Sequence, residues 1–319
     1  MEHNEVKMGI IGLGKRGGNF ALQAAEKGIS VAGKDKSGVE KELSHLKDKG
    51  VNVVDSYEDL VDFLDAPRVF YLLLPAGPTV DRVLEELAPR LDKCDVVIDG
   101  SNSFYLDSIR REEDLADLGI YFLDCGTCGG LKGARNGACF MLGGRIEGVK
   151  VAEPILKSLA ANGSYVYTGD PGSGHFVKLV HDGIELGMCQ AIGEGTALLR
   201  GADYNLNLSN VIENWCQGSM INGRLLESMA ESLKENRFEE LPSYVEDTGQ
   251  ANWLVHDAIE KEIAIPVIAQ SVMELFRSRD REGDAYRSIG LMKKATCGNP
   301  LGKNAEIMQE RISGRVEKI

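Results

Sequence analysis

The chain has 319 residues, and its 36 basic and 49 acidic side chains give a formal net charge of −13. A chain of this length can bury a sizeable core and normally divides into two domains. Acidic residues spread along the chain make nucleic acid and anionic membranes poor partners. No apolar run has the length of a transmembrane helix, and residues 1–5 lack the hydrophobic stretch of a signal peptide. We therefore expect a soluble, cytoplasmic protein without a nucleic-acid or membrane partner.

The strongest early signal is a glycine-rich turn. An apolar strand is expected at residues 7–11, and Gly12-Leu13-Gly14-Lys15-Arg16-Gly17 leads from it into a helical pattern. In this setting a G-x-G-x-x-G sequence predicts a dinucleotide site. Gly12 permits the tight turn, Gly14 lets the backbone approach a pyrophosphate, and Gly17 lets the helix pack on the strand. The phosphates would meet free N–H groups at the start of the helix, beside Lys15 and Arg16.

A second strand is expected at residues 29–33 and leads to Asp35. An acid about 20 residues after the glycine turn usually bonds the ribose hydroxyls of the cofactor's adenosine. The carboxylate would repel a 2′-phosphate, although Lys34, Lys36 and Ser37 could partly offset that repulsion. We therefore expect NAD rather than NADP, with Asp35 and Lys36 in the cofactor site.

Strands and helices alternate over the first 170 residues. Further strands are predicted at 68–74, 95–99 and 120–125, with helices at 79–91 and 107–118 between them. Continuous apolar runs of this kind are typical of parallel strands that are buried on both faces. Ligands of such sheets bind beyond the carboxyl ends of the strands. The residues at those ends are Leu74, Pro75, Asn102 and the loop from Gly126 to Gly130.

After residue 170 the pattern is helical alone. A long helix is predicted from His175 to about Arg200, and shorter ones at 208–222, 223–235, 253–262 and 266–279. The predicted fold class is therefore α/β, with a Rossmann-type dinucleotide-binding domain at residues 1–170. It is followed by an all-helical substrate and dimerisation domain at residues 171–319.

The long helix carries the candidate acid and base. Lys178, Asp182 and Glu185 are spaced by four and three positions, so they share one face of the helix, with His181 close by. Apolar residues occupy nearly all sides of the predicted helix, which indicates that it is buried. A desolvated lysine can act as a base near neutral pH, and a carboxyl group in an apolar or acidic setting can hold a proton. The alternative is a solvated Lys/Glu face that supports the helix weakly.

Seven cysteines do not indicate a disulfide framework in a chain of this size. Cys125 and Cys128 form the one closely spaced pair, and no second pair stands at ligand spacing to complete a structural zinc site. We expect no metal site. One cysteine of the pair is expected to end a strand and the other to lie in a substrate loop.

Together these segments resemble the short bacterial type of decarboxylating 6-phosphogluconate dehydrogenase, a branch of the β-hydroxyacid dehydrogenase superfamily. The resemblance covers at least the first 200 residues and continues more weakly beyond them. The segments that carry it are Gly12–Gly18, Leu74–Gly77, Val97–Ser103, Asp124–Gly133, Met141–Gly144 and Gly174–His181.

The resemblance implies roles for individual residues. Lys178 would take the proton from the 3-hydroxyl of a sugar acid as hydride passes from C3 to the nicotinamide. The resulting 3-keto acid would lose carbon dioxide, and Glu185 would protonate C1 of the enediol to give a ketopentose. The resemblance also implies a homodimer and further residues at the substrate: Asn102, Cys128, Gly129, Gly130, His181 and Asp182.

The chain also departs from the family pattern. Cys128 replaces a serine and Asp182 an asparagine, while Leu186 replaces a phosphate-binding tyrosine found in the long-chain enzymes. Asn252 and Asn299 stand where the family offers further groups for a phosphate. The substrate is thus either 6-phosphogluconate, with Lys293 and Lys294 as expected substitutes at its phosphate, or a related sugar acid.

Three functions are therefore compared. The first is NAD-linked oxidative decarboxylation of 6-phosphogluconate or a related sugar acid. The second is oxidation of a 3-hydroxyacid without decarboxylation, which needs the same glycine turn and lysine. The third is a catalytically weak NAD-binding regulatory protein, to which Asp182 and the altered C-terminal segment point.

Overall fold

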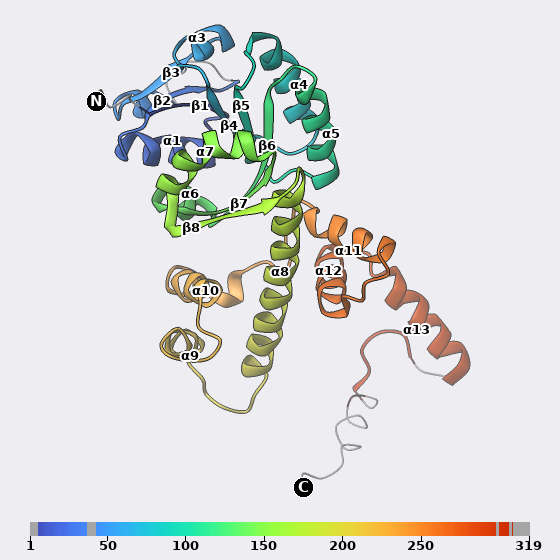
Figure 1. The fold of residues 1–319 in the computed structure, drawn as a ribbon. Coiled ribbons are helices and arrows are strands. Elements are labelled where there is room, and N and C mark those ends of the chain that lie inside the picture. The colour runs from blue at the N-terminus through green and yellow to red at the C-terminus, as the bar shows by residue number, and fades with distance from the viewer. Residues whose placement is uncertain (1–5, 37–42, 298–299, 306–307, 309–319) are drawn as a thin grey trace. The chain divides into compact units, whose positions relative to one another are not determined.

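The computed structural model describes residues 6–36, 43–297, 300–305 and 308 (Figure 1). The chain divides into two compact units. The first comprises Met1–Leu208 and Thr248–Ala269, and the second comprises Ser209–Asp247 and Gln270–Ile319. Ser37 and Asn299 lie outside the described residues. No helix in the described part of the chain is long and apolar enough to cross a membrane.

The first unit is built on one eight-stranded sheet with the order β3-β2-β1-β4-β5-β6-β7-β8. Neighbouring strands are parallel except β6 and β7, which are antiparallel. The strands are β1 (Lys7–Ile11), β2 (Ser30–Lys34), β3 (Val51–Val54), β4 (Val69–Leu72), β5 (Val96–Asp99), β6 (Tyr121–Cys128), β7 (Ala138–Gly144) and β8 (Ala160–Gly169).

Helices cover both faces of this sheet. Side chains alternate between the faces along each strand, so Tyr71 joins the core under α1 and α7 while Phe70 and Leu72 join the core under α4 and α5. This two-sided burial explains the continuous apolar runs in the sequence. The helices of this part of the chain are α1 (Lys15–Glu26), α2 (Ser44–Lys47), α3 (Tyr57–Asp62), α4 (Pro78–Leu87), α5 (Tyr105–Ala116), α6 (Gly130–Asn136) and α7 (Ile146–Leu159).

Two further helices complete the first unit, α8 (Ser173–Arg200) and α11 (Gln250–Glu260). They pack closely, because a Cβ atom on Gly183 would lie 2.2 Å from the Leu254 side chain. The remaining helices are α9 (Leu208–Trp215), α10 (Arg224–Glu235), α12 (Pro266–Arg279) and α13 (Asp284–Cys297). Within the second unit, the Val245 N–H donates to Ser278 Oγ at 3.2 Å.

The predicted fold class is confirmed, because a mainly parallel sheet is followed by helices. The pairs α6/β7 and α7/β8 were not predicted. β7 carries an apolar run from Ala138 to Leu142 that was not assigned to a strand, whereas β8 lacks such a run and is largely exposed. The domain boundary at residue 170 stays a prediction.

The expectation that α8 is buried nearly all round is wrong for the single chain. Its buried side includes Lys178 and Leu179, where it packs on β6 and β7. Ile184, Met188 and Leu198 are 53%, 52% and 77% exposed. The apolar residues of α8 therefore include some on a face of the helix that the other described residues of this chain do not bury.

Candidate active site and cofactor site

The three glycines of the turn after β1 have distinct surroundings. Gly12 has φ +96°, and a Cβ atom there would lie 2.5 Å from the Leu73 carbonyl oxygen. A Cβ atom on Gly17 would lie 1.8 Å from the Gly12 carbonyl oxygen, so α1 packs directly on the turn. A Cβ atom added to Gly14 would have no atom of the described residues within 4 Å. Two glycines thus permit close packing, and the third leaves space at the start of α1, where Lys15 and Arg16 are exposed.

This turn lies where the chain order in the sheet reverses. β1 has β2 on one side and β4 on the other, and in open α/β sheets a position of this kind is where ligands bind. The loop after β4 contains Leu74 and Pro75, and the Leu74 N–H donates to Ser101 Oγ at 3.2 Å. The predicted cofactor residues therefore line one edge of the sheet.

Asp35 follows β2 at the same edge. Its Oδ2 accepts a hydrogen bond of 2.8 Å from the Leu13 N–H, which fixes the carboxylate against the glycine turn, and Lys36 beside it is exposed. Helix α1 has no side-chain cap, so its first N–H groups can serve an anion. The open space at Gly14 and the carboxylate at Asp35 fit the pyrophosphate and ribose of a dinucleotide.

A buried carboxylate fixes the start of α8. Asp124, on β6, is 1% exposed and accepts 2.7 Å hydrogen bonds from the N–H groups of Gly172 and His175. A negative charge at a helix N-terminus is stabilising. The contact is close, since a Cβ atom on Gly126 would lie 2.5 Å from Lys178 Cβ. These contacts hold Lys178 at the carboxyl end of β6.

Lys178 is 7% exposed, and its Nζ donates to Asp182 Oδ1. A buried ammonium group requires such a partner, because desolvating an unpaired charge is costly. A small hollow opens beside this ion pair. It is lined by Asn102, Ser103, His175, Lys178, Leu179, Asp182, Gln250 and Trp253.

Asn102 joins three elements at this hollow. It is 8% exposed and has the left-handed φ of 54°. Its Oδ1 accepts from the Thr127 N–H at 3.1 Å, and its carbonyl oxygen accepts from Gln250 Nε2 at 3.1 Å. The end of β5, the end of β6 and the start of α11 are therefore linked through one residue.

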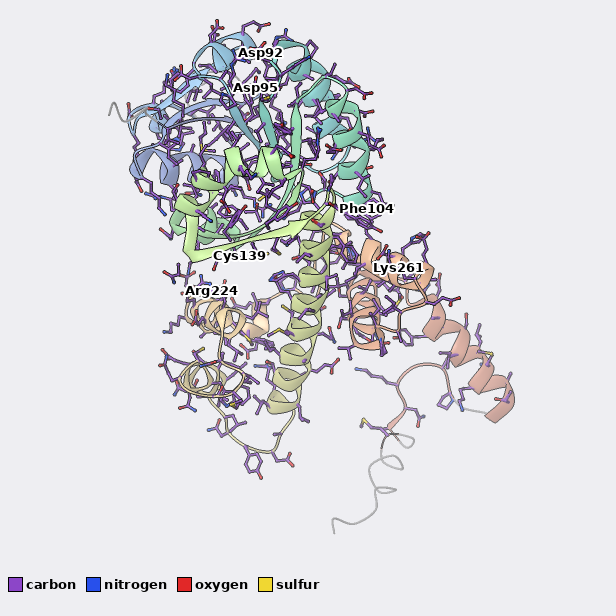
Figure 2. All side chains as sticks on the ribbon, viewed as in Figure 1. Asp92, Asp95, Phe104, Cys139, Arg224 and Lys261 are labelled. Atoms are coloured by element: carbon purple, nitrogen blue, oxygen red, sulfur yellow. The ribbon has the colours of Figure 1, made fainter. Side chains whose placement is uncertain are left out.

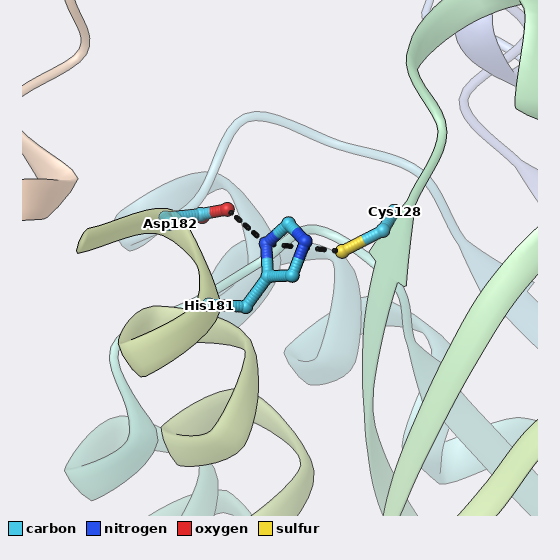
Figure 3. Close-up of side chains that lie close together, drawn as sticks. All are labelled: Cys128, His181 and Asp182. Carbon is cyan, nitrogen blue, oxygen red and sulfur yellow. Dashed lines mark hydrogen bonds and ion pairs between the residues drawn. The ribbon is translucent and has the colours of Figure 1, made fainter. Parts of the chain in front are cut away.

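The side chains of Cys128, at the end of β6, and His181, on α8, point toward each other (Figure 3). The Cys128 Sγ and His181 Nδ1 atoms are 3.6 Å apart, and the same nitrogen is 3.1 Å from Asp182 Oδ1. Glu185 is half exposed, with its Oε2 3.8 Å from His181 Nδ1. Burial raises the pKa of the Cys128 thiol to about 12, so it carries no charge at neutral pH. Gly129 and Gly130, with φ of 119° and 60°, are exposed at the start of α6.

Several residues at the hollow were not among the predicted site residues. His175 is 2% exposed, with Nδ1 2.8 Å from Ser108 Oγ and Nε2 without a hydrogen-bond partner among the described residues. Trp253 packs on Phe104 with ring centroids 5.3 Å apart. Figure 2 shows Phe104 near the start of α8, at the end of the sheet opposite Asp92 and Asp95. The long sequence separations leave no local signal for these contacts.

Other residues of the expected phosphate region do not line this hollow. Leu186 and Asn252 are absent from its lining, and Asn252 is exposed. Lys293 and Lys294 are exposed on α13, in the second unit. Their expected role in phosphate binding stays a prediction, as do the catalytic and binding roles of the residues above.

Comparison with known proteins adds to this geometry. Residues 7–169 match the family model described as the NAD binding domain of 6-phosphogluconate dehydrogenase, and residues 174–311 match its C-terminal domain. The YqeC protein of Bacillus subtilis, whose name is "Putative 6-phosphogluconate dehydrogenase", is 36% identical over 299 residues. The match covers 93% of this chain and 100% of that protein.

Two further relatives differ in cofactor. The NAD(+)-dependent, decarboxylating 6-phosphogluconate dehydrogenase of Haloferax volcanii is 36% identical over 86% of this chain and 91% of that protein. The NADP(+)-dependent enzyme of Bacillus subtilis is 32% identical over 96% of this chain and 68% of that protein. Both cofactors therefore occur among the relatives.

Solved structures agree with this relationship. The 6-phosphogluconate dehydrogenase of Plasmodium falciparum superposes with a TM-score of 0.79 at 26% identity, covering 95% of this chain and 68% of that one. A 3-hydroxyisobutyrate dehydrogenase from Salmonella typhimurium, at 18% identity and a TM-score of 0.72, covers 87% of this chain and 95% of that one and shares the fold. The expected resemblance is confirmed, and the chain belongs to the 6-phosphogluconate dehydrogenase family.

Proposed function

We propose that this protein catalyses the NAD-dependent oxidative decarboxylation of 6-phosphogluconate or a closely related sugar acid to a ketopentose. The observation that carries the proposal is the placement of Lys178. Its amine is buried against Asp182, beside Asn102 and at the carboxyl end of β6. That is the edge of the sheet at which the glycine turn also lies.

In this reaction Lys178 accepts the proton of the substrate's 3-hydroxyl group. Bound NAD supplies the acceptor for the hydride that leaves C3. The 3-keto acid then loses carbon dioxide, and Glu185 returns a proton to C1 of the enediol. Asp182 holds the Lys178 amine in place, and Asn102, fixed by Thr127 and Gln250, orients the substrate. General acid–base steps of this kind contribute roughly 10²–10⁴-fold to the rate.

The substrate is expected to lie between β6 and α8. Cys128 and His181 contact each other there, next to Asp182 of the hollow, and Gly129 and Gly130 follow Cys128 with exposed backbone. The neutral Cys128 thiol can donate a weak hydrogen bond, as a serine hydroxyl would more strongly. The preference for NAD rests on Asp35, whose carboxylate stands beside the glycine turn.

The active form is proposed to be a cytoplasmic homodimer. The exposed apolar side chains of α8, including Ile184 and Met188, are suited to contact with a second copy. The cysteines whose side chains the structure describes are all free, which suits a reducing compartment.

The function can be tested by following NADH formation across a panel of phosphorylated and unphosphorylated aldonic acids while released carbon dioxide is trapped. We expect equal amounts of NADH and carbon dioxide from one member of the panel. NADH without carbon dioxide would indicate a non-decarboxylating 3-hydroxyacid dehydrogenase. Tight NAD binding without turnover of any acid would favour the regulatory function.

A further inference from the structure

Three side chains between β6 and α8 form a set of metal-ligating groups. Cys128 comes from the end of β6, while His181 and Asp182 are neighbours on α8 (Figure 3). One ligand atom from each residue, a thiol sulfur, a ring nitrogen and a carboxylate oxygen, lies within 4.8 Å of the other two. Cys128 and His181 are 53 residues apart, so their spacing along the chain does not indicate a metal site.

The distances within the set suit a tetrahedral ion. Bonds of about 2.0–2.3 Å to zinc place neighbouring ligand atoms roughly 3.3–3.7 Å apart. The Cys128 Sγ to His181 Nδ1 distance of 3.6 Å falls in this range, the Nδ1 to Asp182 Oδ1 distance is slightly shorter at 3.1 Å, and no pair of the three ligand atoms is more than 4.8 Å apart, so the side chains need only small rotations to take up an ion. Both partners approach the same ring nitrogen, so an ion that takes the Nδ1 lone pair would lie between them.

We propose that a divalent ion of the zinc class binds here through Cys128 Sγ, His181 Nδ1 and a carboxylate oxygen of Asp182, with water as fourth ligand. A thiolate with an imidazole is a donor set for zinc and related ions, whereas magnesium and calcium require oxygen ligands. Binding replaces the thiol proton of Cys128 by the metal and releases that proton to solvent. The His181 side chain is 45% exposed, which leaves the ion a path from solution.

Binding at this position changes the candidate base. Asp182 also accepts from Lys178, so the ion and the Lys178 amine compete for one carboxylate. The ion would also tie the end of β6 to α8 through residues that are assigned to the sugar acid. The site is therefore inhibitory, and this consequence, unlike the metal site itself, rests on the proposed function.

The metal site is tested on the full chain by titration with cobalt(II), which reports a thiolate ligand through a sulfur-to-metal charge-transfer band. Wild type should show the band at one ion per chain, and Cys128→Ser should lose it. Cys139→Ser is the matched control, because Cys139 is the cross-strand partner of Cys128 on β7. His256→Ala is a second control and should keep the band, since His256 pairs with Glu260 on an exposed helix surface. No band in the wild type, or a band that survives Cys128→Ser or needs Cys139, would overturn the assignment.

A second measurement uses the competition with Lys178. Lys178→Met removes the positive charge beside the carboxylate, so zinc affinity, measured against a chromophoric chelator, should rise by about tenfold or more. The cobalt band should persist in this variant. An unchanged or weaker affinity would place the ion away from the Lys178–Asp182 pair and overturn the proposal.

The inhibitory role is tested by kinetics. Zinc should lower turnover of the sugar acid by about tenfold or more once the site fills, EDTA should restore it, and raised substrate concentration should oppose it. Zinc binding without loss of turnover would overturn the inhibitory role alone. A wild-type protein that shows the cobalt band but oxidises no sugar acid in EDTA would instead contradict the proposed function.

Discussion

Asp182 sets the electrostatics of the candidate site at the scale of single residues. Its Oδ1 accepts from Lys178, which is 7% exposed, and lies 3.1 Å from His181 Nδ1. Removing one member of a buried ion pair leaves the other charge uncompensated. The Asp182 carboxylate therefore contacts both the candidate base, Lys178, and His181, which is expected to touch the substrate. It holds both side chains in position.

The first prediction concerns Lys178 itself. Lys178→Met keeps the apolar stem but removes the amine, so turnover should fall by at least about 100-fold, the low end for general acid–base catalysis. Cofactor affinity should stay unchanged, because the glycine turn is untouched. Steady-state kinetics and NAD titration check both points, with Lys150→Met, an exposed lysine of α7, as control. Near-normal turnover at neutral pH would remove Lys178 from the mechanism.

The second prediction concerns Asp35. Asp35→Ala removes both the ribose partner and the charge that repels a 2′-phosphate, so the ratio of NAD to NADP affinity should fall by about tenfold or more. Loss of the Leu13 hydrogen bond should cost about 1 kcal/mol of stability. Dissociation constants for both cofactors give the ratio, and Asp48→Ala, at an exposed position, serves as control. A wild type that already prefers NADP would contradict the assignment.

At the scale of elements, the site depends on how α8 is attached to β6. Asp124 accepts the N–H groups of Gly172 and His175, and Gly126 and Gly174 allow the helix to approach the strand. Lys178 follows three residues after His175, about one helical turn further along α8. The position of the candidate base is therefore fixed by the strand, and not by the helix alone.

Asp124→Asn tests this anchor. The amide loses the charge and presents an N–H group to other N–H groups, so unfolding free energy should fall by about 2–3 kcal/mol. Turnover should fall as well, because α8 shifts relative to Asn102. Urea unfolding and kinetics measure the two effects, and Asp117→Asn at an exposed position is the control. A variant of unchanged stability would show that the anchor is not needed.

A second inter-element link gives a pH-dependent prediction. Arg111, 1% exposed on α5, donates to Asp81 of α4 at 2.8 Å and to the Gly77 carbonyl at 3.1 Å. The Arg111 hydrogen bond lowers the pKa of Asp81 from 3.8 to about 2. A lowered carboxyl pKa adds stability above the ordinary value, and that stability is lost as pH falls from 3.8 towards 2.

Asp81→Asn should therefore be less stable than wild type at pH 7 by about 1–2 kcal/mol, after allowance for the partial exposure of the carboxylate. The difference should shrink as the pH falls from about 4 to about 2. Urea unfolding at a series of pH values measures it. A difference that stays constant down to pH 2 would exclude Asp81 as its source.

At the scale of the whole molecule, the single chain leaves apolar surface on α8. The apolar side chains of Ile184 and Met188 are 53% and 52% exposed. Apolar surface of this kind normally meets a partner. A second copy of the chain is the proposed partner.

Light scattering should give a mass of twice 34.7 kDa for the wild type. Ile184→Glu should shift the equilibrium towards monomer by about tenfold or more, since a charge would be buried at the contact. Leu118→Glu is the matched control, because Leu118 is 52% exposed, as Ile184 is, but lies after α5 and not on α8. A monomeric wild type at micromolar concentration would contradict the dimer.

Features that repeat over short distances could be predicted from the amino-acid sequence. Contiguous apolar runs predicted β1, β4 and β5, since strands buried on both faces need apolar side chains at successive positions. The glycine turn predicted a dinucleotide site after β1, and helical spacing placed Lys178 and Asp182 on one face. These signals need only local geometry.

Which of these elements meet could not be predicted from the sequence and depends on long-range contacts. The antiparallel direction of β7, the anchoring of α8 by Asp124, and the contact between Gln250 and Asn102 join segments far apart in the chain. The approach of Cys128 to His181 is of the same kind. Periodicity tells which face of an element is buried but not which partner buries it. The partner is chosen by packing and by the pairing of buried polar groups across the whole fold.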